Sequence, residues 1–474
     1  MVTAGNRRIL GARHVAALAI SAVALAGMSL TSSARAAVPS LAPSVALPAA
    51  QQGKAVARPY IKVLSRTHFG TPPTTADCFG AFGIACYGPT QFQRAYDMPP
   101  LYAAGLTGKG RTIVIVDSFG SPTVAADLAR FDSDFGLPAP PSLNVIAPAG
   151  PVPPFDPTDP EMVGWAEETS LDVQYAHAMA PGANILLVET PVAETEGTVG
   201  FPEIVAAENY VINHNLGDVI TQSFGATELT FPTPQSLLNL RGAFANALVH
   251  RVTVLASSGD AGATDNKADG LDYYPFRVIS WPSSDPLVTS VGGTQLHLDA
   301  TGVRIAPDNV WNDTELFGSP AASGGGLSSI FSRPLFQLGV GNVVGSRRGT
   351  PDISMSAAVD GAALVYFGFG GDEPGYYLIG GTSEASPMFA GVVAVADQAA
   401  GHRLGLIDPY LYLLGGLHSP GIPDVTSGNN SVTFPQDGQT ITVDGFNAVP
   451  GYDLATGLGT VDGSQLVNAL SRFP

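Results

Sequence analysis

The sequence predicts an α/β fold built on a largely parallel sheet with helices on both faces. Four short apolar runs, rich in β-branched residues, recur along the chain at 112–117, 184–189, 219–225 and 252–257. Segments with helical character separate them, including 163–178 and 202–214. Continuous apolar strands that alternate with helices are typical of a parallel sheet covered on both faces. In such folds, functional sites form at the carboxyl ends of the strands.

The composition is that of a large globular protein with few charges. The chain has 474 residues, of which 45% are hydrophobic and 13% are charged, enough for a large buried core. The formal net charge of −18 argues against nucleic acid or an anionic membrane surface as a partner. So few charges suit an acidic medium, in which carboxylates lose charge. We expect a monomer.

The N-terminal residues 1–36 have the pattern of a signal peptide. Arg7 and Arg8 precede an apolar run at about 15–30, and Ala-Arg-Ala at 34–36 matches a cleavage site. Ordinary secretion and twin-arginine export both remain open. A membrane anchor is the less favoured alternative because the run is short, and no other stretch is long enough to span a bilayer. We therefore expect a secreted, extracellular protein with no stable membrane anchor.

The remaining chain divides into two parts. Residues 37–86 are rich in Ala and Pro and show little periodicity, which predicts a linker or the remnant of a prosegment. This part contains both cysteines, Cys78 and Cys86, and in an exported chain they predict one disulfide that closes a small loop. From 87 to 474 we expect one large domain without internal repeats, which is the catalytic unit if the chain is an enzyme.

Two carboxylates, Glu168 and Asp172, lie four residues apart in a segment with helical character. This spacing places them on one helix face, whereas Glu167 lies off that face. A solvated helix face is the ordinary explanation, but the neighbouring Leu171 and Tyr175 indicate partial burial. Buried carboxyl groups within hydrogen-bond reach share protons, and one pKa rises. The pair is therefore a candidate acid–base pair that works at acidic pH.

Asp260 follows the fourth apolar run in the loop Ser257-Ser-Gly-Asp-Ala-Gly262. An Asp in a turn beside glycine is the ordinary explanation. The functional alternative is a protonated carboxyl group that donates a hydrogen bond to an oxyanion, which requires a low pH or a raised pKa.

Ser383 follows Gly380-Gly-Thr382 at the predicted start of a long apolar helix. A helix N-terminus favours developing negative charge, so the position suits a nucleophile; it also suits a helix cap. We expect Pro387 in the first turn of the helix, and Ser386 is a rival nucleophile farther into it. No histidine occurs in a subtilisin-type H-G-x-H context, which makes Glu168 the candidate base.

Near the C-terminus, Asp424 and Asp453 lie on glycine-rich loops. Carboxylates with main-chain carbonyls nearby are hard oxygen ligands for Ca²⁺, although the spacing fits no EF-hand and simple turns are the alternative.

Together these stretches resemble the sedolisin family, serine-carboxyl peptidases that share the subtilisin fold. The resemblance covers about 87–474 and rests on the order of four motifs: E-x-x-x-D, S-G-D-x-G, G-T-S-x-x-x-P, and D-V-T-x-G with G-Y-D-x-x-T-G-x-G. It implies a subtilisin-like fold and an acid-acting endopeptidase for protein or peptide substrates, with tripeptidyl-peptidase action as a further alternative.

The resemblance also implies roles. Ser383 matches the nucleophile, Glu168 the general base, Asp172 the carboxylate that orients it, and Asp260 the oxyanion-hole acid. Asp117, at the end of the first run, matches an acid that extends the carboxylate chain. The implied single calcium site comprises the carboxylates of Asp424 and Asp453 and the main-chain carbonyls of Val425, Val449 and Gly451. Ser223-Phe-Gly225 resembles the edge that pairs with the substrate backbone.

One departure from the family pattern is the short stretch, about fifty residues, between the signal peptide and the catalytic region, where the family carries a long prodomain. Two alternatives stay open. One is a histidine-dependent subtilisin-like protease in which Asp117 or Asp172 works with His177, with a neutral pH optimum. The other is an exported binding protein on a peptidase fold, without turnover.

Overall fold

The computed structural model describes residues 54–64, 68–369 and 374–474. The signal peptide expected at 1–36 and the first part of the 37–86 segment lie outside these ranges. Within the described ranges, no helix combines the length and apolar character that crossing a bilayer requires.

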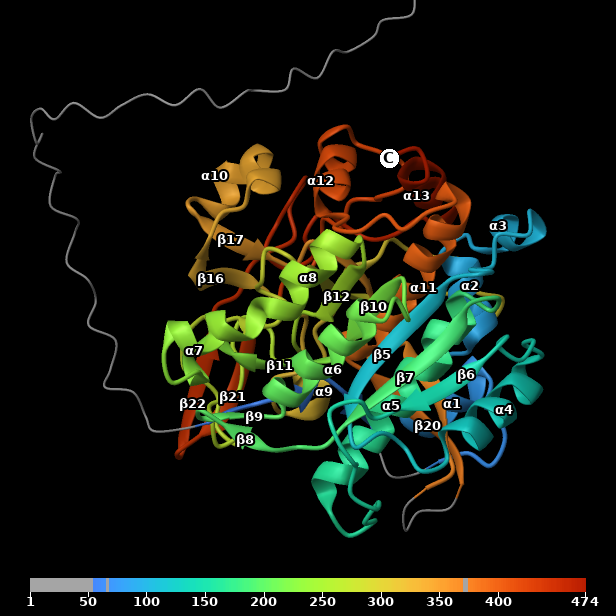
Figure 1. The fold of residues 1–474 in the computed structure, drawn as a ribbon, viewed down its shortest axis with the longest axis horizontal. Coiled ribbons are helices and arrows are strands. Elements are labelled where there is room, and N and C mark those ends of the chain that lie inside the picture. The colour runs from blue at the N-terminus through green and yellow to red at the C-terminus, as the bar shows by residue number, and fades with distance from the viewer. Residues whose placement is uncertain (1–53, 65–67, 370–373) are drawn as a thin grey trace, which may run out of the picture. The chain divides into compact units, whose positions relative to one another are not determined.

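The centre of the fold is an eight-stranded, largely parallel sheet, which confirms the predicted fold class (Figure 1). Six pairs of neighbouring strands are parallel, and the short edge strand β15 (Asn309–Val310) pairs antiparallel with its neighbour. In spatial order the strands are β15 (Asn309–Val310), β14 (Thr289–Gln295), β12 (Thr253–Ser257), β10 (Val219–Gln222), β5 (Thr112–Ser118), β7 (Asn184–Thr190) and β6 (Leu143–Ile146), with β18 (Ile353–Ser356) also paired to β14.

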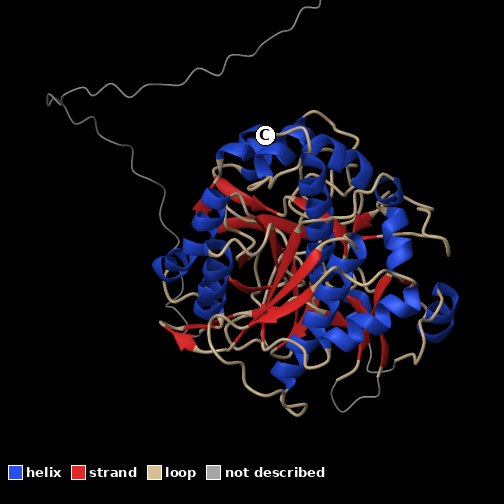
Figure 2. Cartoon of the chain, turned by 45° about the vertical axis from the view of Figure 1, so that its right-hand side comes forward, coloured by secondary structure: helices blue, strands red, loops and turns tan. Residues whose placement is uncertain are grey.

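Both faces of this sheet are buried, because successive side chains of a strand point to opposite faces. Along β5, Ile113 and Ile115 pack into one hydrophobic cluster, whereas Val114 and Val116 pack into another. Figure 2 shows the central strands with helices around them. Side chains from six helices pack into the first cluster: α2 (Pro89–Ala95), α4 (Val124–Phe135), α5 (Pro160–Met179), α11 (Thr382–Ala400), α12 (Asp408–Gly416) and α13 (Gly463–Leu470). The second receives α6 (Phe201–Asn213), α7 (Pro234–Leu238) and α8 (Gly242–His250).

The predicted strands and helices are present, with one difference that matters for the site. The third apolar run does not form one strand: β10 ends at Gln222, and after Ser223 the chain enters β11 (Phe224–Thr227). The strand β11 belongs to a second sheet, where it pairs with β13 (Ser280–Trp281) and β2 (Arg58–Pro59). The run divides because its second half pairs with a segment far away in sequence.

Smaller sheets surround the centre. One joins β3 (Lys62–Val63), β20 (Gly375–Gly380), β19 (Ala362–Phe367) and β4 (Cys86–Tyr87). The others are β1 (Ala55–Val56) with β9 (Thr198–Val199) and β8 (Glu194–Thr195), β16 (Gly326–Ser332) with β17 (Arg347–Thr350), and β21 (Val432–Gln436) with β22 (Gln439–Val443). The remaining short helices are α1 (Thr75–Phe82), α3 (Pro99–Ala103), α9 (Thr314–Phe317) and α10 (Gly341–Val344). Turns of 3₁₀ helix lie at 228–230, 239–241 and 335–340.

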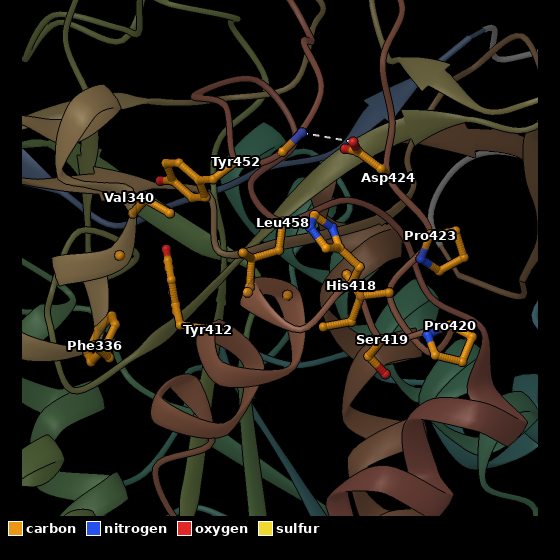
Figure 3. A pocket seen from close by; sticks show the side chains of 15 residues that line it. Phe336, Val340, Tyr412, His418, Ser419, Pro420, Pro423, Asp424, Tyr452 and Leu458 are labelled. Atoms are coloured by element: carbon orange, nitrogen blue, oxygen red, sulfur yellow. Dashed lines mark hydrogen bonds between the residues drawn. The ribbon is translucent and has the colours of Figure 1, made fainter.

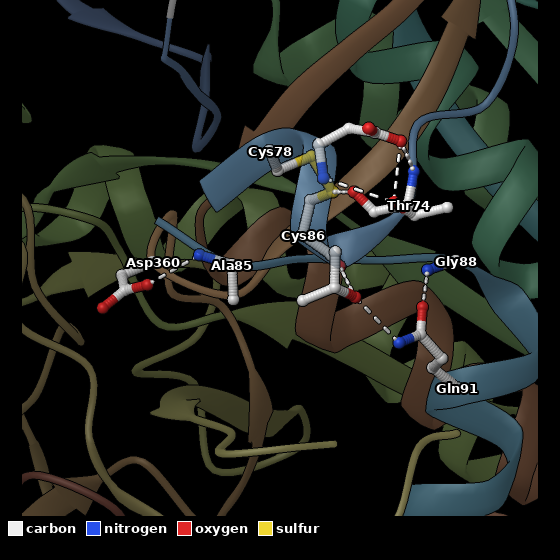
Figure 4. Close-up of a disulfide and its surroundings, with 9 residues drawn as sticks. Thr74, Cys78, Ala85, Cys86, Gly88, Gln91 and Asp360 are labelled. Atoms are coloured by element: carbon white, nitrogen blue, oxygen red, sulfur yellow. Dashed lines mark hydrogen bonds between the residues drawn. A yellow bond between two sulfur atoms is a disulfide. The ribbon is translucent and has the colours of Figure 1, made fainter. Parts of the chain in front are cut away.

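The expected disulfide between Cys78 and Cys86 is present and ties α1 to β4 (Figure 4). Both cysteines are fully buried in the main core. The strand β4 pairs with β19, and the Ala85 N–H donates to Asp360 Oδ1 at 3.0 Å. The sequence places the start of the catalytic domain at 87 and regards 37–86 as a linker. That division stays a prediction, but the structure shows ordered, core-forming elements before residue 87.

Candidate active site

Three carboxyl groups gather where β5 ends against α5. Asp117 is the penultimate residue of β5, and Glu168 and Asp172 lie one turn apart in the middle of α5. All three residues are fully buried. Asp172 Oδ1 accepts a hydrogen bond from the Ser223 hydroxyl at 2.8 Å. The predicted helix pair is therefore present, and its face is in the core rather than in solvent.

The helix α5 can hold charged groups in the core because it is buried on nearly every side. Asp159 caps its first turn by accepting from the Glu161 N–H at 2.9 Å, and Pro160 occupies its first position, where a missing N–H costs nothing. Sixteen of its twenty residues are buried. Such a helix carries no single apolar stripe, so the sequence pattern alone does not show which face meets the sheet.

Burial and mutual repulsion control the protonation of this cluster. Burial raises the pKa of Glu168 well above its usual value, and the neighbouring charges of Asp172 and Asp117 raise it further. Burial also raises the pKa of Asp172, to which Asp117 adds, and raises the pKa of Asp117 to about 7. The three groups hold fewer than three negative charges at acidic pH and titrate together. This is the state that the sequence analysis expects of an acid–base pair.

Ser383 is the second residue of α11, which begins at Thr382 after Gly381. Its hydroxyl donates to the Ser223 carbonyl at 3.2 Å and is close enough to Glu168 to lower the pKa of that carboxyl group. Neither carboxyl oxygen of Glu168 has a hydrogen bond of full geometry among the described residues. The hydroxyl of Ser383 thus lies close to a carboxyl group whose acceptor capacity is unused.

The predicted place of Pro387 needs correction. It lies in the second turn of α11, inside the helix, rather than in the first turn. Because proline has no N–H, the Ser383 carbonyl lacks the donor that a helix normally supplies. Ser383 is not the helix cap either, since Gly381 holds that position.

Asp260 reaches the same point from the loop after β12. Its Oδ1 accepts from the Thr382 N–H at 2.7 Å and from the Thr382 hydroxyl at 2.8 Å. Its Oδ2 is buried and has no hydrogen-bond partner among the described residues. Burial raises the pKa of Asp260 to about 7. Below that pH the carboxyl group is protonated, and Oδ2 is the oxygen that can carry the proton because Oδ1 already accepts two hydrogen bonds. The Oδ2 hydroxyl is then available to donate a hydrogen bond.

Gly381 allows these groups to meet. Its φ is +115°, a region that favours glycine. A Cβ atom built there would lie 2.5 Å from Asp260 Oδ2 and 2.4 Å from the Tyr60 carbonyl oxygen. Tyr60 belongs to the N-terminal segment, and its carbonyl accepts a hydrogen bond from the Ser383 N–H at 3.2 Å.

The rival residues point elsewhere. His177, at the end of α5, is fully buried; its Nε2 lies 2.8 Å from the Pro138 carbonyl and 3.2 Å from Asp132 Oδ1. The Ser386 hydroxyl lies 2.8 Å from that of Thr221, on β10. The structure therefore brings neither residue into the Ser383–Glu168 contact.

The expected calcium residues lie on two loops, 424–425 and 449–453, that contact each other. Asp424 Oδ2 accepts from the Gly451 N–H at 2.8 Å, and Asp453 Oδ2 accepts from the Val449 N–H at 3.2 Å. No described residue donates to the main-chain carbonyls of Val425, Val449 and Gly451. Two carboxylates beside three unused carbonyls fit Ca²⁺ in donor type. Figure 3 shows Asp424 at the rim of a pocket that Tyr412, Tyr452 and Leu458 also line.

Comparison with known proteins gives consistent results. Kumamolisin of Bacillus sp. (strain MN-32) is 33% identical over 393 residues, which are 81% of this chain and 63% of kumamolisin. Sedolisin of Pseudomonas sp. (strain 101) is 31% identical over 382 residues, 80% of this chain and 60% of sedolisin. The solved structure of Pseudomonas sedolisin, described as a serine-carboxyl proteinase, matches with a TM-score of 0.67 at 29% identity, over 81% of this chain and 98% of that one. This chain belongs to the sedolisin family.

Other relatives include human tripeptidyl-peptidase 1, which is 28% identical over 322 residues, 64% of this chain and 51% of that protein. No protein-family model matches the chain. The chain spans less than two thirds of the length of these curated relatives. The match to sedolisin confirms the expected subtilisin-like fold.

Sequence reasoning missed three contributors to this sedolisin-type site. The Ser223 hydroxyl holds Asp172, and Thr382 holds Asp260 through two hydrogen bonds. Ser223 lies in the S-F-G motif and Thr382 in the G-T-S motif, both of which the sequence analysis had recognised. Their place in these motifs was the sequence signal that could have identified them. The third is Tyr60, whose carbonyl meets Ser383; it lies in a segment without a periodic pattern, so no sequence signal pointed to it.

Proposed function

We propose that this chain is a secreted, acid-acting serine-carboxyl endopeptidase that hydrolyses peptide bonds in proteins through an acyl-enzyme on Ser383. The observation that carries the proposal is the contact between the Ser383 hydroxyl and Glu168, within a fully buried carboxyl cluster that ends at Asp117. His177, the rival base, makes its hydrogen bond to Pro138 instead.

In the first half of the reaction, Glu168 takes the Ser383 proton while the serine oxygen attacks the peptide carbonyl carbon. Asp172 shares a proton with Glu168 and so spreads the negative charge over both carboxyl groups. Asp172 Oδ1 in turn accepts a hydrogen bond from the Ser223 hydroxyl at 2.8 Å. Because the three carboxyl groups titrate together, the cluster keeps negative charge that can accept the Ser383 proton even in an acidic medium.

The developing oxyanion is stabilised by two donors, the Ser383 N–H and the protonated Oδ2 of Asp260. The Oδ1 atom of Asp260 is already fixed by Thr382, so the donor is oriented before the reaction, which is what makes such donors effective. Glu168 then gives its proton to the leaving amine. Water attacks the ester by the same route and releases the acid product.

The N-terminal segment supports endopeptidase action over tripeptidyl-peptidase action. Residues from Ala55 to Tyr60 lead continuously to the carbonyl that meets Ser383, and β1 and β2 within them pair with β9 and β11. In a tripeptidyl-peptidase, the cleft would be closed beyond the third residue before the cleaved bond. In this protein the cleft instead holds a segment that continues at least from Ala55 to Tyr60, so it can hold chains longer than three residues.

We also propose one structural calcium ion at Asp424, Asp453 and the carbonyls of Val425, Val449 and Gly451. When bound, it would supply positive charge that holds two C-terminal loops together. Removal of calcium with EGTA should lower the melting temperature, and Asp424→Asn should abolish the effect of added calcium. An EGTA-insensitive melting temperature in the metal-loaded protein would contradict this site.

A peptide aldehyde tests the proposed nucleophile directly. At pH 4, ¹³C NMR with a peptide aldehyde carrying ¹³C at its carbonyl carbon should show labelling of Ser383 as a hemiacetal in the wild type and no hemiacetal in Ser383→Ala. Ser386→Ala serves as the matched control and should still be labelled. Labelling that persists in Ser383→Ala would overturn the assignment, and a non-catalytic binding protein would show no Ser383-dependent adduct at any pH.

A further inference from the structure

The residue that follows Ser383 is a glutamate to which the proposed mechanism gives no role. Glu384 lies in the first turn of α11 and is fully buried. Neither of its carboxyl oxygens has a hydrogen bond of full geometry among the described residues. An unsatisfied buried carboxyl group costs free energy, and a function next to the nucleophile would account for that cost.

The side chains that face Glu384 carry hydroxyl groups. Burial raises the pKa of Glu384 well above its usual value, and the nearby Ser356 hydroxyl, at the end of β18, lowers it in part. Burial raises the pKa of Tyr175, on α5, and the charge of Glu384 adds to that rise. Burial also raises the pKa of Tyr96, which follows α2, and here the charge of Asp308 adds more than that of Glu384. Glu384 is therefore surrounded by three hydroxyl groups from three different elements.

An ionised Glu384 would have no counter-ion. It takes part in no ion pair among the described residues. Arg304 packs over the Tyr96 ring, but its Nε lies 2.9 Å from Asp308 Oδ1 and is paired there. The dipole of α11 favours negative charge in its first turn, yet a buried carboxylate without a counter-ion costs more than this gain. The closed structure therefore holds Glu384 protonated at acidic pH.

The strand β18 contacts the turn that carries Ser383 at two points. Directly after β18, the Ala357 carbonyl accepts from the Gly381 N–H at 2.7 Å, on one side of the nucleophile. On the other side, Glu384 meets the Ser356 hydroxyl. Because β18 pairs with β14 in the central sheet, these two contacts fix the nucleophile turn relative to that sheet.

This turn depends on such contacts because its own helix supplies few hydrogen bonds. Pro387 has no N–H, so the Ser383 carbonyl lacks its intrahelical donor. Within the turn, the Glu384 N–H donates to the Gly381 carbonyl at 2.9 Å. A protonated Glu384 can both donate to the Ser356 hydroxyl and accept from it, whereas a carboxylate can only accept.

We propose that Glu384 is a positioning residue for Ser383: in its protonated form it fixes the nucleophile turn to β18, and its ionisation releases that turn. The effect on catalysis rests on the proposed peptidase function, whereas the release of the turn does not. Release with rising pH adds to the loss of the protonated Asp260 and confines the active enzyme to acidic media.

Release of the turn should increase with pH. Glu384 has a higher pKa in the closed turn than in the released turn, where water surrounds it and its pKa is about 4. Its contribution to the stability of the closed turn is therefore complete below about pH 4 and is lost as pH rises through the raised pKa. Between these two limits, each pH unit multiplies the released fraction by about ten.

Hydrogen exchange measures this release. Amide exchange of the full-length protein is followed by mass spectrometry between pH 5 and 7 and corrected for the intrinsic effect of pH. At the start of α11 the opening equilibrium should rise more steeply in the wild type than in Glu384→Gln, by about 10-fold per pH unit. Glu208→Gln is the matched control and should keep the wild-type slope, because Glu208 is also fully buried but lies on α6, on the other face of the sheet. Equal slopes in the wild type and Glu384→Gln would overturn the proposal.

Kinetics at pH 4 test the effect on the nucleophile. Glu384→Met keeps a side chain of similar length but cannot donate a hydrogen bond. It should lower kcat on a peptide substrate by about 10- to 100-fold with little change in KM, because a displaced nucleophile impairs the reaction rather than substrate binding. Glu384→Gln, whose amide is neutral and can donate, should restore most of kcat. Wild-type kcat in Glu384→Met would contradict the positioning role.

The two measurements separate this proposal from the proposed function. A melting curve at pH 4 shows whether Glu384→Met is folded, and if it is not, the exchange slopes of the wild type and Glu384→Gln decide. If the wild type does not digest casein in a Ser383-dependent way at any pH, the proposed function fails. The exchange slopes then still show whether Glu384 holds the turn.

Discussion

At the scale of single residues, the site depends on polar atoms that are buried with their hydrogen-bonding capacity unused. Both oxygens of Glu168, one of Asp172 and one of Asp260 have no partner of full geometry among the described residues. Such atoms cost free energy in a folded protein. In the proposed mechanism these carboxyl groups of Glu168, Asp172 and Asp260 are the ones that move or hold protons, which gives the cost a function there.

Asp260 should set the alkaline side of the pH dependence. Burial raises its pKa to about 7, and the proposed role needs the protonated form, so activity should fall as pH rises through about 7. In Asp260→Asn the donor does not titrate, and this fall should move to higher pH. Asp260→Ala should lose on the order of 100- to 1,000-fold in kcat. These values are read from kcat measured between pH 3 and 8, and an unchanged alkaline limb in Asp260→Asn would contradict the role.

Gly381→Ala should abolish activity while the protein still folds. A methyl group there would approach Asp260 Oδ2 and the position of the bound carbonyl within 2.5 Å, at a φ of +115°. We expect kcat/KM to fall at least as far as in Asp260→Ala. Gly401→Ala, at the other end of α11, is the control: its φ is also positive, at +78°, but no atom lies within 4 Å of its Cβ. It should cost about 1 kcal/mol of stability and no activity; equal activity in both variants would be inconsistent with a crowded site at 381.

At the scale of elements, the sequence predicted most of the framework that positions these residues. The runs that become β5, β7 and β12 and the helices α5 and α6 were recognisable, because strands buried on both faces are apolar throughout. The break at Ser223 was not, since it arises from pairing of β11 with β2, more than 150 residues earlier in the chain. Local pattern carries no information about such a partner.

The disulfide supports an element that sequence analysis placed in a linker. Since Cys78–Cys86 closes a loop with a sequence separation of 8, replacing both cysteines with alanine should lower the free energy of unfolding by about 2–3 kcal/mol. Urea unfolding of oxidised wild type and double variant measures this, with kcat at 25 °C as a check that the site is intact. An identical urea midpoint for both proteins would mean that the packing of α1 and β4 alone supports this region.

At the scale of the whole molecule, buried carboxyl groups outside the site also favour the protonated form. Burial raises the pKa of Glu208 to about 8 and that of Asp397 to about 7. The 40 acidic residues outnumber the 22 Lys and Arg residues, so protonation also reduces the repulsion that a net charge of −18 creates. The molecule as a whole is therefore suited to the acidic medium in which its proposed chemistry operates.

Stability should accordingly fall as pH rises. For each of these carboxyl groups the pKa is higher in the folded than in the unfolded state, where it is about 4. Between about pH 4 and the folded-state pKa values of about 7 and 8, the folded state binds more protons, so the free energy of unfolding decreases as pH increases and levels off above these values. Calorimetry should find a melting temperature at pH 4.5 higher by several degrees than at pH 7.5. A higher value at pH 7.5 would show that other groups dominate.

What the sequence could not provide at this scale was the position of residues 54–63. The composition of this segment is that of a linker, and it is positioned by pairing with three strands that are distant in sequence, β9, β11 and β20. The four catalytic candidates were identified from motif order because each motif is local. How the chain occupies its own cleft depends on contacts between distant parts, which no local motif encodes.

The most direct test is digestion of denatured haemoglobin from pH 2.5 to 8 by the wild type, Ser383→Ala, Glu168→Gln and Glu208→Gln. Glu208 is a matched control, because it is also a fully buried glutamate with a raised pKa. We expect an acidic optimum in the wild type and in Glu208→Gln, and loss of digestion in the other two. For Glu168→Gln the loss should be on the order of 100- to 10,000-fold. A neutral optimum that survives Glu168→Gln would contradict the assignment and place the base elsewhere.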